Sequence, residues 1–434
     1  MKESQRDSGL VRAVGPWGLA ASTVGIVVGA SIFVVPAALA ANIGLYAPLA
    51  ILVCALSVGS VAICFAEGGS RIPSSGGAYG YIEAAFGPLT GYVAGTLLWF
   101  GDVLASGGIA AALADLGASL LPEPSKAPAH ALIIVGIIGG IALVNIAGVT
   151  RGIRLVNATT MLKIAPLLIF VLVGAFSIHA GNFQRSGAVS GTGLGRAVIL
   201  AMFAFMGMET ALSASGEVLQ PERTIPRALA LGMGAVTLLY LGIQIVAQGI
   251  LGPSLALSKA PLVDAMAEVS PALRWLMLAG AAMSMVGFLS SDILGTPRVL
   301  FAFARDGLLP KSLGRVHARS HAPHVAIACY AAIAIVLALT GTFTELAVLS
   351  ALTTAPLYIL GCAATWRIVR GGVALSGEPL NFRWLGMATI LGISSMAALI
   401  ALASRDEILG LLVFMAVTVS VYLVQTKISR AARR

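Results

Sequence analysis

The sequence predicts an all-α integral membrane protein with about twelve transmembrane helices. Of its 434 residues, 58% are hydrophobic and only 10% are charged, and the mean hydropathy is +0.95. A soluble domain usually carries about 25% charged residues, so a chain of this length could not cover its surface with so few charges. Lipid must therefore surround most of the chain.

Long apolar runs define the individual spans. A helix needs about 20 apolar residues to cross the bilayer. The divisions near Thr342 and Arg405 are the least marked. Because a polar N-terminus leads directly into the first run, we expect no cleavable signal peptide. The runs cover roughly 14–40, 45–67, 88–120, 130–149, 155–179, 196–218, 227–251, 272–303, 324–341, 343–366, 385–403 and 407–426.

Basic residues orient these spans. The net charge is +9, and 19 of the 27 Lys and Arg residues fall in segments on the N-terminal side of the membrane, against 6 on the other side. Basic loops stay in the cytoplasm, so we expect a multi-pass protein of the cytoplasmic (inner) membrane with both termini cytoplasmic. The charge thus reflects orientation in the lipid bilayer and not nucleic-acid binding.

Two spans contain sequences that interrupt a helix. Span 1 carries glycine and serine across 25–33 and then Pro36, and span 6 carries Gly207 followed by Ser213 and Gly216. Glycine and proline weaken helices, and interruptions at corresponding places in two halves point to a transporter site. Freed amides there can hold a carboxylate and freed carbonyls an amine. The alternative is close helix packing through small residues.

Ionisable residues inside spans are costly and usually functional. Lys163 has the alternative of extending toward the cytoplasmic surface, and Asp292 that of a structural ion pair with Arg298. The spacing of the four cysteines matches neither a metal-binding motif nor a disulfide framework. We therefore predict four buried free thiols and expect neither a metal nor a cofactor. The four ionisable residues are Asp102, Lys163, Glu209 and Asp292, and the cysteines are Cys54, Cys64, Cys329 and Cys362.

Five motifs in order resemble the amino acid–polyamine–organocation (APC) superfamily, and the chain is similar to bacterial amino-acid permeases and to the arginine–agmatine antiporter. The resemblance covers nearly the whole chain. One departure is Ser31, which replaces the usual second glycine of the first motif. The motifs are Gly29 to Ala37; Pro73 to Tyr79 with Phe86 to Pro88; Asn157 with Lys163; Gly207 to Glu209 with Gly216 to Val218 and Pro221 to Ala228; and Arg305 to Pro310.

The resemblance implies a LeuT-type fold in a single transmembrane domain over 1–434. Inverted repeats would cover about 14–179 and about 196–366, with peripheral spans at about 385–426. It also implies the site. Amides of Gly29, Ala30 and Ser31 would face the substrate carboxylate, while Gly25 and the stretch from Phe203 through Met206 to Gly207 would frame the amine and the side-chain pocket. Phe203 and Phe288 match gate positions, with packing as the alternative, and Tyr81 and Thr353 or Thr354 are further candidates.

Coupling residues also follow from the resemblance. Lys163 would lie where sodium-driven relatives bind their second sodium, between the span-1 break and Ser290/Ser291. Its ammonium would replace the ion, and transport would be sodium-independent, by proton coupling or exchange. Glu209 would be a buried carboxyl at the span-6 break that senses pH or links substrate to gating, with a purely structural buried acid as the alternative.

Asp102 bears on the choice of substrate. Gly91, Tyr92 and Trp99 align span 3 with the antiporter, which puts Asp102 on the substrate-facing side. A substrate with a side-chain cation would satisfy this carboxylate, which favours cationic or amine-bearing substrates such as arginine, lysine, ornithine or their diamines. The competing interpretation is that Asp102 hydrogen-bonds Ser106 and that the substrate is a small neutral amino acid.

The best-supported function is therefore an amino-acid permease or exchanger, with a polyamine or amine transporter as the first alternative. A non-transporting receptor or assembly subunit is the alternative from another class. We expect no enzyme, because the sequence offers no nucleophile–base pair, metal cluster or phosphate loop. The exact substrate and the oligomeric state, a homodimer included, are left open.

Overall fold

The computed structural model describes residues 15–72, 78–122, 125–148, 163–183, 190–208, 219–320, 322–374 and 379–431. Within these ranges the chain is helical and contains no strand. Seven described helices are long and apolar enough to cross a membrane, and four shorter apolar helices accompany them. The predicted all-α, multi-span fold is confirmed.

Each predicted span coincides with one or two helices. Two short helices, α4 and α12, have no counterpart in the predicted spans. The helices are α1 (Pro16–Val27), α2 (Val35–Ile43), α3 (Ala47–Arg71), α4 (Ala78–Phe86), α5 (Pro88–Ala118), α6 (Lys126–Ile146), α8 (Ile164–Gly174), α9 (Gly191–Phe205), α11 (Pro221–Leu251), α12 (Pro261–Val269), α13 (Pro271–Gly295), α14 (Pro297–Arg305), α15 (His324–Thr340), α16 (Phe343–Arg370), α17 (Leu385–Ala401) and α18 (Arg405–Ala431).

Reciprocal caps create the two divisions that are least marked in the sequence. At the start of α16 the Glu345 amide donates to the Thr342 hydroxyl, and the Thr342 amide donates to the Glu345 carboxylate. Ser404 and Glu407 exchange the same pair of hydrogen bonds where α18 begins. Each capping box satisfies two amides that a new helix leaves unbonded, so the chain can turn sharply and re-enter an apolar run.

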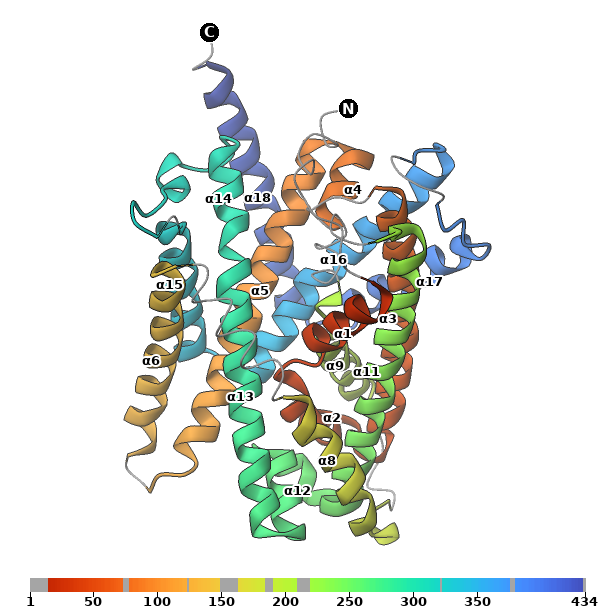
Figure 1. Cartoon of the computed structure of the whole chain (residues 1–434), viewed down its shortest axis with the longest axis vertical. Coiled ribbons are helices and arrows are strands. Elements are labelled where there is room, and N and C mark those ends of the chain that lie inside the picture. Colours follow the sequence, from red (N-terminus) through yellow and green to blue (C-terminus); the bar gives the residue numbers. More distant parts are fainter. Residues whose placement is uncertain are drawn as a thin grey trace.

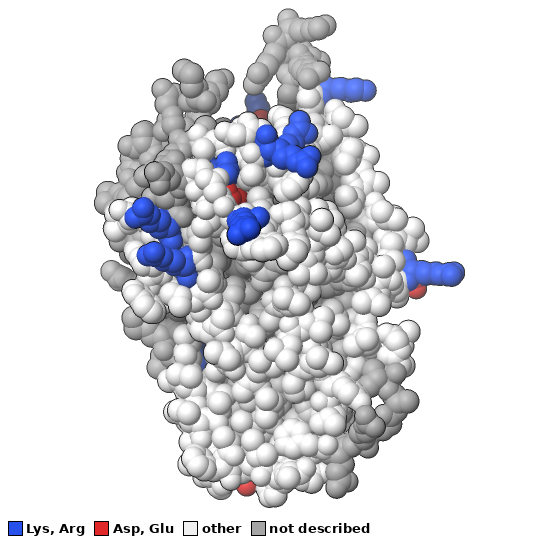
Figure 2. All heavy atoms as spheres, turned by 90° about the vertical axis from the view of Figure 1, so that its right-hand side faces the viewer, with Lys and Arg blue, Asp and Glu red and all other residues white. Residues whose placement is uncertain are grey.

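The loops collect at two opposite ends of the helix assembly. In Figure 1, α4, α14 and the end of α18 lie at the upper end, and α12 lies at the lower end. Figure 2 shows Lys and Arg side chains mostly in the upper half of one face, while the lower half is almost free of charge. This asymmetry agrees with the charge bias on which the predicted orientation depends.

Both predicted interruptions are present. After α1 ends at Val27, the short 3-10 helix η1 (Ser31–Phe33) precedes α2. α9 ends at Phe205, and Gly207 has a φ of +107°, a conformation that a residue with a side chain rarely adopts. Glu209 lies outside the described residues.

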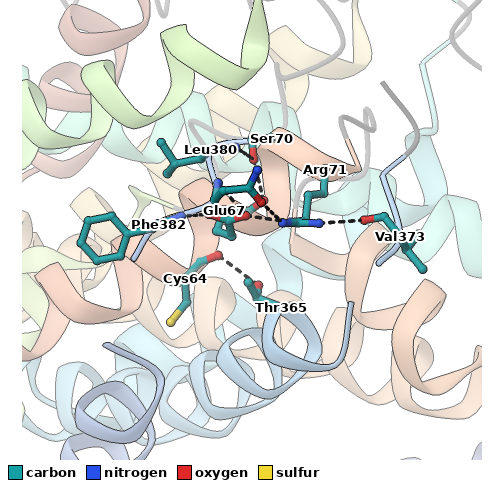
Figure 3. A network of polar contacts seen from close by, with 9 residues as sticks. Cys64, Glu67, Ser70, Arg71, Thr365, Val373, Leu380 and Phe382 are labelled. Atoms are coloured by element: carbon teal, nitrogen blue, oxygen red, sulfur yellow. Dashed lines mark hydrogen bonds and ion pairs between the residues drawn. The ribbon is translucent and has the colours of Figure 1, made fainter. Parts of the chain in front are cut away.

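A buried ion pair holds the end of α3 to the segment after α16 (Figure 3). The Arg71 Nε donates to the Glu67 carboxylate at 2.7 Å, and both side chains are almost fully buried. The amide of Phe382 donates to Glu67 at 2.9 Å, and Arg71 donates to the Asn381 side chain at 2.6 Å and to the Val373 carbonyl at 3.3 Å. Glu67 is a buried charge inside a predicted span that the sequence analysis did not single out.

Candidate functional site

The break in span 1 presents backbone amides of the kind that bind anions. Within the described part of the chain, the amides of Ala30 and Ser31 have no backbone acceptor. They stand at the start of η1, where the positive end of a helix dipole favours a carboxylate. The Gly29 amide differs from the prediction, because it donates to the Val27 carbonyl at 2.7 Å. Ala30 and Ser31 thus remain the candidates to hold a substrate carboxylate.

Two helix ends supply the opposite polarity. α1 and α9 finish with their carbonyl ends at the breaks, and such ends carry a partial negative charge. The hydroxyl of Tyr240, on α11, lies 2.8 Å from the Val27 carbonyl oxygen and 3.0 Å from that of Ala204. Carbonyl oxygens of this kind can accept hydrogen bonds from the amine of a ligand. Tyr240 was not among the predicted site residues, since a tyrosine in an apolar span is usually a packing residue.

Lys163 contacts the first of these helices. Its side chain is 5% exposed, and its ammonium donates to the Gly25 carbonyl. In a continuing helix this carbonyl would accept a hydrogen bond from the Gly29 amide. Here the Gly29 amide donates to the Val27 carbonyl instead. The ammonium therefore satisfies an acceptor that the break has freed, and the alternative of a lysine extended to the membrane surface is wrong.

The two serines that were predicted to lie beside Lys163 do not contact it through hydrogen bonds in the described ranges. Ser290 is buried and donates to the Val286 carbonyl of its own helix at 2.6 Å, whereas Ser291 is exposed. The link from span 5 to span 1 is present, and the link from span 5 to span 8 through these hydroxyls is not.

Asp292 of α13 sits in a network of hydroxyl groups. Its carboxylate accepts hydrogen bonds from Ser106 at 2.5 Å, from Thr296 at 2.8 Å and from the Tyr330 hydroxyl. Among the described residues it forms no ion pair with Arg298. The structural ion pair is therefore wrong as an account of this residue.

Asp102 joins the same network from α5. The Thr296 hydroxyl lies 2.9 Å from the Asp102 carboxylate as well as 2.8 Å from that of Asp292. Ser106 donates to Asp292 and not to Asp102, so the Asp102–Ser106 bond of the competing interpretation is not formed. Because Thr296 carries a single hydroxyl hydrogen, both of its contacts can be hydrogen bonds only when one of the two carboxyls is protonated.

The remaining predicted residues divide into two groups. Phe203, Met206 and Gly207 lie at the break in span 6, where the Phe203 ring packs edge-on against Phe343 at 5.8 Å. Thr353 lies close to Gly101, next to Asp102 in the chain.

Tyr81 lies elsewhere, beside Gly68 and edge-on to Phe65 near the end of α3. Phe288 is partly buried on α13. The structure thus gathers most of the predicted residues around the breaks and α5, and it places Tyr81 apart from them, against the end of α3.

The sequence matches the family model described as amino acid permease over residues 14–426. The chain therefore belongs to the amino acid permease family, a class of membrane transporters. It is 27% identical to Branched-chain amino acid permease BcaP of Bacillus subtilis, over 74% of this chain and 73% of that protein. It is 28% identical to Branched-chain amino acid permease BcaP of Lactococcus lactis, over 68% and 69%, and 34% identical to Uncharacterized transporter Rv1999c of Mycobacterium tuberculosis, over 73% and 71%.

Proposed function

We propose that the chain is a sodium-independent secondary transporter of amino acids in the cytoplasmic membrane, with both termini cytoplasmic and with the two interrupted spans at equivalent places in inverted repeats. The observation that carries the proposal is the paired breaks. One break offers the amides of Ala30 and Ser31, and the ends of α1 and α9 offer carbonyls. A free amino acid is a carboxylate and an ammonium on one carbon, which matches this pair of polarities.

Neutral aliphatic amino acids are the favoured substrates. The residues at the span-6 break include Phe203 and Met206, which suit an apolar side chain. The Asp102 carboxyl group already has a protein partner, because the Thr296 hydroxyl lies 2.9 Å from it. Two of the relatives carry names that describe branched-chain amino acid permeases.

Cationic amino acids are the second candidate, because Asp102 and Asp292 place two carboxyls around one hydroxyl. A cationic side chain would complement their charge.

Sodium independence is supported by Lys163. Its ammonium donates to a carbonyl of the span-1 break and places a positive charge there. A sodium ion bound at the same carbonyl would have to displace or approach that charge, which is unfavourable in a buried site. Protons can drive transport instead, since Asp102 and Asp292 share the Thr296 hydroxyl in a geometry that calls for one bound proton.

A screen by ligand-induced thermal stabilisation tests the choice of substrate. Leucine, isoleucine and valine should raise the melting temperature of the purified protein, because a ligand at about 100 times its Kd stabilises the folded state by about 2.7 kcal/mol. Arginine, lysine and putrescine should leave the melting temperature unchanged. Stabilisation by arginine or putrescine without stabilisation by leucine would instead select the cationic or amine-transport hypothesis.

A further inference from the structure

One hydroxyl group lies between the two interrupted helices. Tyr240 is fully buried on α11, a helix that packs directly against α1 (Figure 1). Its hydroxyl oxygen is 2.8 Å from the carbonyl of Val27, the last residue of α1, and 3.0 Å from the carbonyl of Ala204, the penultimate residue of α9. The Tyr240 ring packs edge-on against Phe205 at 5.2 Å.

The breaks explain why a donor is needed at this place. In an uninterrupted helix the Val27 carbonyl would accept the Ser31 amide, and the Ala204 carbonyl would accept the Met208 amide. Neither of these backbone bonds forms in the described part of the chain. Val27 accepts the Gly29 amide instead, and the Tyr240 hydroxyl is the side-chain donor that reaches both carbonyls.

The chemistry of the phenol makes this more than a packing contact. Two helix carbonyl ends carry partial charges of the same sign and repel one another. A tyrosine hydroxyl has one hydrogen, which can be shared between the two carbonyl oxygens in a three-centre hydrogen bond. The position of the hydroxyl therefore sets how closely the two ends approach.

We propose that Tyr240 is a positioning residue that fixes the spacing of the two helix ends across which the backbone of the substrate binds. This inference rests on the proposed function. A change in that spacing weakens recognition of the ammonium and carboxylate, which all amino acids share. It leaves the contacts of the substrate side chain as they are.

The substitution Tyr240→Phe isolates the hydroxyl, because phenylalanine keeps the ring and its contact with Phe205. The KM for leucine should rise about tenfold, the Vmax should stay within about twofold of the wild-type value, and valine and isoleucine should show the same relative rise in KM. The matched control is Tyr358→Phe on α16, which removes another fully buried tyrosine hydroxyl and should keep the wild-type KM.

A second variant keeps the inference testable if the Tyr240→Phe protein fails to fold. Incorporation of 3,5-difluorotyrosine at position 240 retains the O–H and makes it a stronger donor, so the KM should equal or fall below the wild-type value; a raised KM in this variant would overturn the inference. An unchanged KM in folded Tyr240→Phe, or a lower Vmax at constant KM, would also overturn it. A wild-type protein that carries no amino acid would overturn the proposed function and the inference together.

Discussion

Replacement of Lys163 by methionine should lower amino-acid uptake by about tenfold or more while the protein stays folded. Methionine has a similar length but cannot donate to the Gly25 carbonyl, which the helix break leaves as an acceptor. A buried acceptor that loses a charged donor costs about 1.5–3 kcal/mol, and this corresponds to about a tenfold to hundredfold effect on an equilibrium that positions the break. Initial rates of uptake into proteoliposomes measure the loss.

Lys259→Met provides the matched control. This lysine has a side chain that is 79% exposed, and it lies 3.8 Å from Asp115 in a surface ion pair. Exposed pairs contribute little, so Lys259→Met should transport at the wild-type rate. Wild-type uptake by folded Lys163→Met would show that the ammonium has no part in transport.

The substitution Glu67→Gln should cause the largest loss of stability, about 3–5 kcal/mol. The guanidinium of Arg71 would remain buried without its counter-charge, and removal of one partner of a buried ion pair is strongly destabilising. The segment after α16 would also lose a charged acceptor for the amides of Asn381 and Phe382. Thermal unfolding in detergent measures the effect as a lower melting temperature.

Asp115→Asn is the comparison for this experiment. Its carboxylate is 44% exposed, and both of its ion-pair distances are 3.8 Å, so its loss should move the melting temperature little. If the Glu67→Gln protein melts at as high a temperature as the Asp115→Asn protein, the buried ion pair does not stabilise the fold as proposed.

Much of the fold was predictable because lipid imposes simple demands on a sequence. A span needs about 20 apolar residues, and each predicted run coincides with one or two helices. The break in span 6 was also visible in the sequence, since Gly207 adopts a conformation that glycine tolerates best. α12 was missed because its nine residues are too few for a span.

The contacts of single side chains were harder to predict. Asp292 and Arg298 are six residues apart, which turns a helix by about 600°, so the two side chains face different directions. Two partners of Asp292, Ser106 and Tyr330, come from α5 and α15, far away in the sequence. Its third partner, Thr296, is only four residues away. Tyr240 and Lys163 bind backbone carbonyls that the breaks expose, and a sequence pattern does not reveal which carbonyls these are.

Sodium-independent amino-acid transport can be measured as uptake of radiolabelled leucine into proteoliposomes in which choline replaces all sodium. We expect saturable uptake that an inward proton gradient accelerates, that excess unlabelled isoleucine or valine suppresses, and that added sodium does not change. Uptake that requires sodium would contradict the role given to Lys163. No uptake or exchange of any amino acid, with or without sodium, would contradict the proposed function itself.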